Sequence, residues 1–159
     1  MKIFQGLLIC LLSVQLLSCG SSAGSDPAPT PQPTVSQLVS KSWSVSTASW
    51  DGVTQYSKGA TSNLVSGYSQ FKLDLTSSTS ASITEFDGRK FTGTYTLSVD
   101  NKKITLNGLT SSEGAPSGTN GTLEFNIVGT PSASALSLET SSTYIKASNK
   151  KVSLALVNP

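Results

Sequence analysis

The thiol of Cys19 is the side chain of this sequence that is best suited to covalent chemistry. The chain contains two cysteines, Cys10 and Cys19, and no histidine. A thiolate is the strongest common nucleophile among side chains. Ser18 lies directly before Cys19, and a small residue at that point is typical of the cleavage site of an export signal. We therefore expect Cys19 to be chemically modified, since Cys10 would leave with the signal.

The first 18 residues have the composition of such a signal. Lys2 supplies a positive charge, and residues 3–17 are mostly apolar. This stretch is shorter than the roughly 18 to 20 apolar residues that a membrane-spanning helix needs. We predict a signal peptide over residues 1–18 that is removed from the mature protein.

The sequence Leu16-Leu17-Ser18-Cys19 resembles a bacterial lipobox. The resemblance implies that Cys19 receives a diacylglycerol and that the signal is cut after Ser18. The new amine then accepts a further acyl chain such as palmitate. Two or three chains anchor a protein firmly, because each buried methylene contributes about 0.8 kcal/mol. Gly20 follows where many inner-membrane lipoproteins carry Asp, so we expect an outer-membrane lipoprotein that faces the periplasm, with exposure at the cell surface as the alternative.

The sequence gives little evidence for catalysis, metal binding or nucleic-acid binding. Without histidine or a free thiol, the mature chain lacks the groups for Ser-His or Cys-His catalysis and for the usual zinc sites. Glu85 and Asp87 could share a strand face as paired acids, but Asp87 also begins an Asp-Gly turn, which explains it. After residue 18 there are ten basic and nine acidic side chains, without a basic stripe for phosphates. We expect no enzyme activity, no cofactor, no metal and no nucleic-acid partner.

A proline-rich segment separates the signal from the rest of the chain. Residues 19–34 include prolines at positions 27, 29, 31 and 33, a spacing that favours an extended backbone. We interpret this segment as a tether that carries the lipid on Cys19. The remaining residues, 35–159, are numerous enough for one domain with a core of its own.

Apolar residues in that domain recur at every second position, which is typical of half-buried strands. The clearest example runs from Phe91 through Tyr95 and Leu97 to Val99. Ser and Thr make up 46 of the 141 residues from Cys19 onward, which also favours strands with solvated outer faces. We predict an all-β fold of about eight antiparallel strands in a meander that forms a barrel or half-barrel, with a β-sandwich as the alternative.

Three segments of this domain resemble the lipocalin-like lipoproteins of Gram-negative bacteria. They are an early strand with Trp43, the segment Gly93-Thr94-Tyr95-Thr96-Leu97, and the turn and strand over residues 100–106. The resemblance implies a lipocalin-like barrel that holds a small apolar molecule. Aromatic side chains are the candidates for lining it: Trp43, Trp50, Tyr56, Phe71, Phe91, Tyr95 and Phe125.

Two functions from different classes follow from these observations. The first is a lipid-anchored binding protein for a small apolar ligand. The second is a structural or interaction protein of the cell envelope, whose barrel is filled by its own side chains. An eight-stranded barrel is only just wide enough for its own side chains or one small ligand, so the volume of the interior separates the two. The sequence leaves the oligomeric state and any protein partner open.

Overall fold

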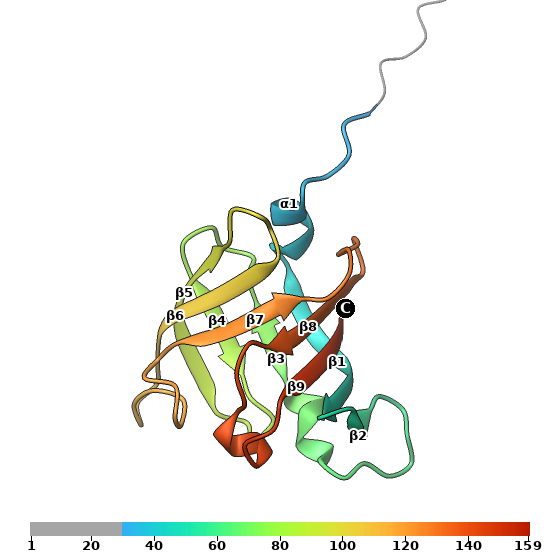
Figure 1. Ribbon diagram of the computed structural model, residues 1–159, viewed down its shortest axis with the longest axis vertical. Helices are drawn as coiled ribbons and strands as arrows, with labels where there is room; N and C mark the ends of the chain where they lie inside the picture. The colour runs from blue at the N-terminus through green and yellow to red at the C-terminus, as the bar shows by residue number, and fades with distance from the viewer. Residues whose placement is uncertain (1–29) are drawn as a thin grey trace, which may run out of the picture. The chain divides into compact units, whose positions relative to one another are not determined.

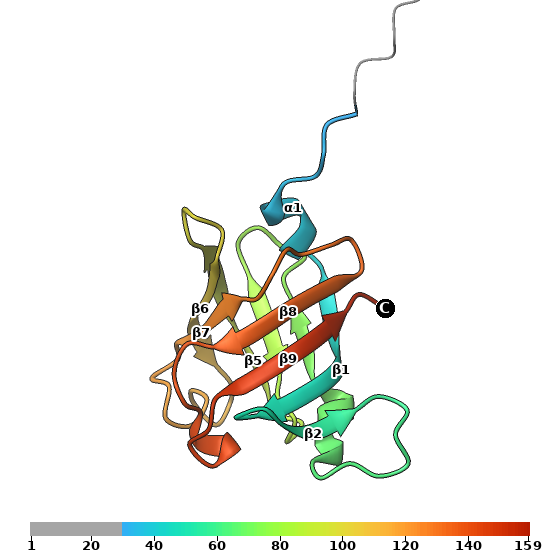
Figure 2. The same cartoon turned by 45° about the vertical axis from the view of Figure 1, so that its right-hand side comes forward.

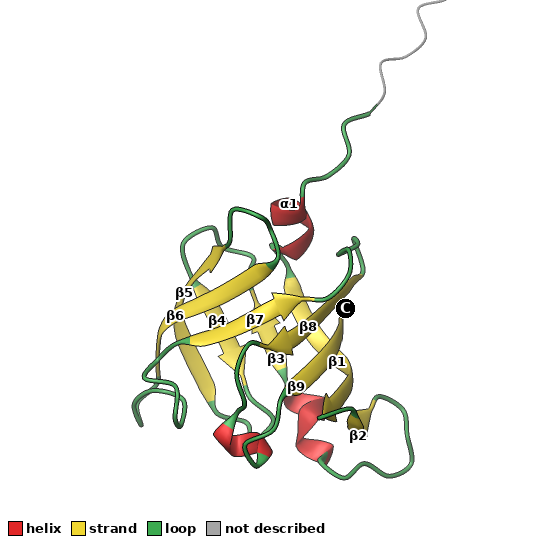
Figure 3. Cartoon of the chain, viewed as in Figure 1, coloured by secondary structure: helices red, strands yellow, loops and turns green. Residues whose placement is uncertain are grey.

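A computed structural model describes residues 30–159, so the predicted signal peptide and most of the predicted tether lie outside the described residues. The compact unit begins at Gln32. Its elements, shown in Figures 1 and 3, are α1 (Val35–Val39), β1 (Ser42–Trp50), β2 (Val53–Ser57), η1 (Ser66–Gln70), β3 (Lys72–Asp74), β4 (Ala81–Thr84), β5 (Lys90–Leu97), β6 (Lys103–Thr110), β7 (Leu123–Ile127), β8 (Ala135–Thr140), η2 (Ile145–Ala147) and β9 (Val152–Val157). Here η marks a short 3-10 helix.

Eight of the strands close into an antiparallel barrel. Following β1, strands β3 to β9 pair in chain order, and β9 returns to pair with β1. Figure 2 shows β8, β9 and β1 side by side at this closure. Strand β2 pairs with the end of β1 and lies outside the ring. The predicted meander barrel is confirmed, and the closure excludes both the half-barrel and the sandwich.

Alternation along each strand explains why the barrel has one core. In β5, Phe91 is buried while Thr92 and Thr94 are exposed, and β6, β7, β8 and β9 show the same alternation. Because successive side chains of a strand point to opposite faces, each apolar set faces the barrel interior. The predicted inward face of β5 is confirmed from Phe91 to Leu97, with Tyr95 and Leu97 only partly buried, but its predicted extension to Val99 is wrong, because the strand ends at Leu97 and Val99 is fully exposed.

Helix α1 covers the end of the barrel that is uppermost in Figure 1. Thr34 caps it, because its hydroxyl accepts a bond from the Gln37 amide while the Gln37 side chain accepts one from the Thr34 amide. The indole of Trp43 donates to the Val39 carbonyl over 2.9 Å, which ties α1 to the core. Thr34, which the sequence placed in the tether, thus belongs to the folded unit. Within residues 30–159, no helix has the length and apolar character needed to cross a membrane.

Two strands differ from the sequence-based interpretation. Strand β2 was not predicted, because its burial does not alternate: Gln55 and Tyr56 are buried in succession. Strand β6 continues to Thr110, although the sequence from Gly108 to Gly121, with four glycines and one proline, predicts a long loop. Gly93 explains that pairing, since a Cβ there would lie 2.3 Å from the Asn107 carbonyl oxygen, at the β-bulge between β5 and β6.

Candidate functional site

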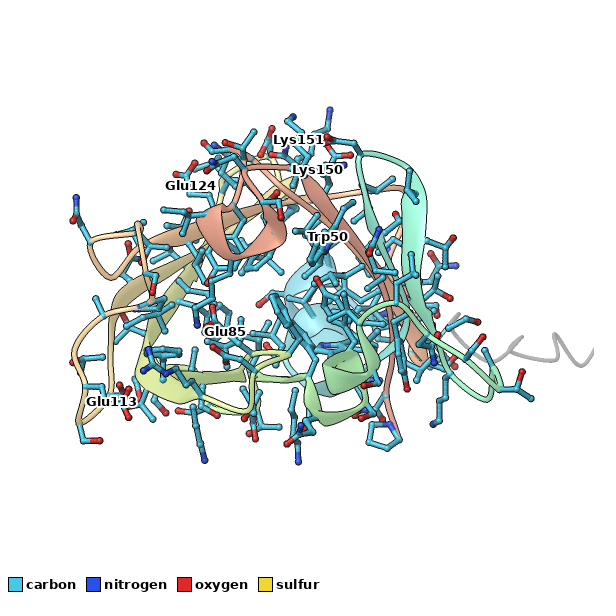
Figure 4. The ribbon with its side chains drawn as sticks, turned by 90° about the horizontal axis from the view of Figure 1, so that it is seen from below. Trp50, Glu85, Glu113, Glu124, Lys150 and Lys151 are labelled. Carbon is cyan, nitrogen blue, oxygen red and sulfur yellow. The ribbon has the colours of Figure 1, made fainter. Side chains whose placement is uncertain are left out.

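The lower end of the barrel, opposite α1, contains the chemistry-bearing side chains. The turn between β4 and β5, the two 3-10 helices and the long loop after β6 meet here (Figure 1). Figure 4 looks at this end from below, with Glu85 inside the ring of strands and Glu113 and Glu124 at its periphery.

Glu85 is a buried acid held by two partners from the segment between β8 and β9. Its side chain is 3% exposed. Its Oε1 accepts a hydrogen bond from the Tyr144 hydroxyl, and its Oε2 accepts one from the Lys146 ammonium. A buried carboxylate is tolerated only when its oxygens are paired in this way. The pairing therefore fixes η2 across the lower end of the barrel.

Lys146 connects Glu85 to a second acid. Its Nζ lies 2.7 Å from Oδ2 of Asp87 and 5.5 Å from the centroid of the Phe91 ring. The Lys146 side chain is 13% exposed, so the ammonium is largely withdrawn from water. Glu85 and Asp87 do share a site, as the spacing of the two acids allowed, but they converge on a lysine.

Burial and charge shift the pKa of several groups at this end. Burial raises the pKa of Tyr68 to about 12, against the effect of its hydrogen bond from Trp50. Burial, the hydrogen bond to Glu85 and the charges of Glu85 and Asp87 hold the pKa of Tyr144 well above its ordinary value. Burial alone would lower the pKa of Lys146, but its bonds to Asp87 and Glu85 outweigh burial and raise it.

Five aromatic rings pack beside Glu85. Tyr68 is at the centre, with its ring centroid 4.9 Å from that of Phe86 and 6.3 Å from those of Tyr56 and Phe71. The Trp50 indole donates to the Tyr68 hydroxyl over 2.8 Å. Helix η1 carries Tyr68 into this position, and Gly67 permits the approach, since a Cβ at 67 would lie 2.0 Å from the Phe86 carbonyl oxygen.

A small cavity lies between these rings and the last strands. It has a volume of about 30 Å³, which is room for roughly one water molecule. Its wall is almost entirely apolar, although Glu85, Tyr68 and Tyr144 are among the residues that line it. Its further lining residues are Phe71, Ile83, Phe86, Leu123, Phe125, Thr140, Val152 and Leu154.

A larger groove lies on the outside of the same wall. It has a volume of about 240 Å³ and is lined by residues of the β6–β7 loop and of the segment after β8, many of them hydroxylated. The cavity and the groove share three lining residues, Leu123, Thr140 and Tyr144. Tyr144 therefore contributes to both the outer polar groove and the inner apolar cavity, which Glu85 also lines.

The aromatic residues predicted to line a ligand site lie at both ends of the barrel. Phe71 and Phe125 line the cavity, and Trp50 and Tyr56 belong to the aromatic group beside it. Phe91 is buried at the lower end under Lys146. Trp43 packs near α1, as does Tyr95, whose hydroxyl contacts Ser40 and the Leu75 carbonyl. Cys19 lies outside the described residues.

Tyr144 and Lys146 were missed by sequence reasoning. They stand in a segment without periodicity, between two strands, where a tyrosine and a lysine carry no signal of their own. Glu85 was the one sequence feature that indicated such partners, because it is an acid directly after the alternating residues of β4 and before an Asp-Gly turn. An acid that continues the inward face of a strand requires a cationic or hydrogen-bonding partner.

Comparisons with known proteins complete the description. No protein-family model matches the chain. A search of curated proteins finds no relative. Among solved structures, the chain is similar to a lipocalin-like protein from Bacteroides uniformis ATCC 8492, at 16% sequence identity and a TM-score of 0.45 over 77% of this chain and 99% of that one. The strand order itself defines an eight-stranded up-and-down barrel, which is the lipocalin-like architecture.

Proposed function

We propose that the chain is a lipid-anchored bacterial lipoprotein whose barrel binds a small molecule at its lower end. The observation that carries the binding function is that the outer groove and the inner cavity share Leu123, Thr140 and Tyr144. Binding sites in β-barrels are commonly found at the mouth, with apolar walls and a few convergent polar groups of perturbed pKa. Tyr68 and Tyr144 are such groups, and Glu85 adds a buried carboxylate beside them.

The two volumes support a ligand position in the groove. A small apolar molecule in the centre of the barrel, the hypothesis from sequence, would need far more than the cavity of about 30 Å³. The groove of about 240 Å³ accommodates the body of a small polar molecule. A narrow group of that molecule then reaches the cavity when Tyr144 turns aside.

A matched pair of blocking variants tests this site. Thr143 and Thr92 are both exposed threonines, but only Thr143 lines the groove. In native mass spectrometry of the purified protein, we expect the natural chain and Thr92→Trp to retain a small molecule that Thr143→Trp loses. Retention by Thr143→Trp as well would place the ligand elsewhere.

A second candidate is supported by the packing of the interior. Twelve large side chains, among them Trp43, Phe91 and Leu106, are less than 2% exposed. A barrel filled in this way suits a structural or interaction protein of the envelope. The absence of any retained small molecule, together with proteins of the envelope cross-linked to the natural chain, would favour this candidate.

The lipid anchor rests on the sequence of residues 16–19 and is tested independently of the barrel. Cys19→Ser removes the thiol that would be alkylated, so we expect an uncleaved precursor without acyl chains. Labelling with radioactive palmitate and partitioning into detergent would report the change. Unchanged labelling in Cys19→Ser would overturn the lipobox interpretation.

Two further experiments test the location of the protein. Density-gradient fractionation with outer-membrane markers tests whether it lies in the outer membrane, and protease treatment of whole cells tests whether it faces the periplasm or the cell surface.

A further inference from the structure

We propose that the molecule bound at the lower end is a small primary amine, whose ammonium group enters the cavity and binds Glu85. This inference rests on the proposed binding function and names its ligand class. It follows from the size of the cavity, from the charge around it and from the chemistry of its walls.

Size favours a compact polar head. The cavity of about 30 Å³ holds roughly one water molecule, and an ammonium group is about as large as water. A bulkier head would not fit beside Glu85, whereas the body of the ligand can remain in the groove of about 240 Å³. Hydroxyl groups of Thr119, Thr122 and Thr143 line that groove and can bind a polar body.

Charge favours a cation and disfavours an anion. With Arg89 and its partner Glu113 included, three carboxylates (Glu85, Asp87 and Glu113) meet two cations (Lys146 and Arg89), so this cluster carries a residual negative charge. The nearby Arg89 is paired with Glu113 outside the cavity. In a site withdrawn from water, a second cation next to Glu85 is attracted more strongly than it would be at the surface. Burial is the main cause of the raised pKa of Tyr144, and the hydrogen bond to Glu85 and the charges of Glu85 and Asp87 add to it.

The walls also suit a cation. Tyr68, Phe71, Phe86 and Phe125 line the cavity, and aromatic faces attract ammonium groups. Lys146 already shows this mode of recognition within the chain, because its Nζ lies between the two acids and over Phe91. The ammonium of a ligand would reach Oε1 of Glu85 by displacing the Tyr144 hydroxyl, which donates to that oxygen.

Three probes that differ in one terminal group test the ligand class: 4-amino-1-butanol, 1,4-butanediol and 4-hydroxybutanoate. Binding is measured by NMR titration of the full chain, from the amide resonances of residues 118–124 and 140–145. We expect the amine to bind about tenfold more tightly than the diol, since a charge-assisted hydrogen bond replaces a neutral one, and the carboxylate to bind more weakly still.

Two variants test whether the Glu85 carboxylate causes the preference for the amine probe. Glu85→Gln should abolish the preference for the amine, while Glu139→Gln, at an acid outside the groove that pairs with Lys151 on the surface, should retain it. Because Glu85→Gln could unfold the barrel, Tyr144→Phe provides a second test: it frees Oε1 and should tighten amine binding several-fold without changing diol binding.

The results distinguish a failure of the amine inference from a failure of the proposed binding function. If the probes bind without preference, or if Tyr144→Phe leaves the affinity for the amine unchanged, the amine inference is wrong and the binding site stands. If none of the three probes perturbs the groove resonances, the proposed binding function fails together with the inference.

Discussion

The Tyr144 hydroxyl donates a hydrogen bond to Oε1 of Glu85, although the two residues are 59 positions apart in the chain. This contact joins the turn after β4 to the segment between β8 and β9, so it closes the lower end of the barrel by side chains and not by strand pairing. The stability of that end therefore depends on a few polar groups, and the predictions below address them.

Loss of the Lys146 ammonium should destabilise the fold strongly. Lys146→Met keeps the length of the side chain but leaves Glu85 buried without its cation. Removing one partner of a buried pair costs about 3 to 5 kcal/mol, and because Tyr144 still pairs with Glu85 we expect about 3 kcal/mol in urea unfolding. Lys151→Met, at an exposed pair 3.5 Å from Glu139, should cost less than about 0.5 kcal/mol. Equal costs would contradict the structural role of Lys146.

Stability should fall at both extremes of pH. The pKa of Tyr68 is raised to about 12, so the stability that this phenol contributes is present below pH 10 and is lost as the pH rises towards 12. The loss is on the order of 2 to 3 kcal/mol for this buried group. The pKa of Asp87 is lowered because Lys146 and Arg89 outweigh its burial, so its contribution is present above pH 3.8 and is lost in acid.

Urea unfolding at a series of alkaline pH values measures how the free energy of unfolding declines as Tyr68 ionises. Tyrosinate absorbance provides a second probe. Tyr68→Phe removes the group that titrates, so its stability should decline less between pH 10 and 12 than that of the natural chain. Tyr95→Phe, at a partly exposed tyrosine of the opposite end, serves as the control and should leave the decline unchanged. A steep decline that persists in Tyr68→Phe would assign it to other groups.

The folded unit should be independent of the residues before it. A chain that begins at Gln32 retains Thr34, which caps α1, and should melt cooperatively with a β-type circular dichroism spectrum. Thr34→Ala removes the cap and should cost about 1 kcal/mol. In the full chain, Thr30→Ala, four residues before Thr34 and exposed, should cost nothing measurable. A non-cooperative melt of the shortened chain would show that earlier residues support the fold.

Period-two alternation was sufficient to predict an antiparallel all-β meander because each strand buries one face against a shared core, but it left barrel, half-barrel and sandwich open. Phe91, Leu106 and Phe125 on neighbouring strands all follow it. The extra strand β2 escaped the prediction because a strand outside the ring is not constrained to alternate. The register of hydrogen bonds that joins β9 to β1 has no local signal, since the paired residues Trp50 and Val152 are about a hundred positions apart.

The candidate site was accessible from the sequence only in part. Several aromatic side chains and the acids Glu85 and Asp87 could be selected by residue type. Their partner Lys146 could not, because Lys146 and Glu85 are 61 positions apart and meet only after the barrel has closed. A lysine beside a turn is ordinarily solvated, and here the topology alone brings it over a buried acid.

The last prediction concerns Phe91, which supports both the core and the site. Phe91 is 1% exposed and pairs with Ile83 across β4 and β5, while Lys146 lies over its ring. Phe91→Ala should cost about 3 to 5 kcal/mol, as expected for a buried aromatic, and Thr92→Ala on the outer face should cost less than about 0.5 kcal/mol. Thermal melts of the two variants measure the difference. Phe91→Leu should recover most of the loss from packing but not the contact between Lys146 and an aromatic face, so it separates the two roles. If Phe91→Ala and Thr92→Ala cost the same, the inward face assigned to β5 is wrong.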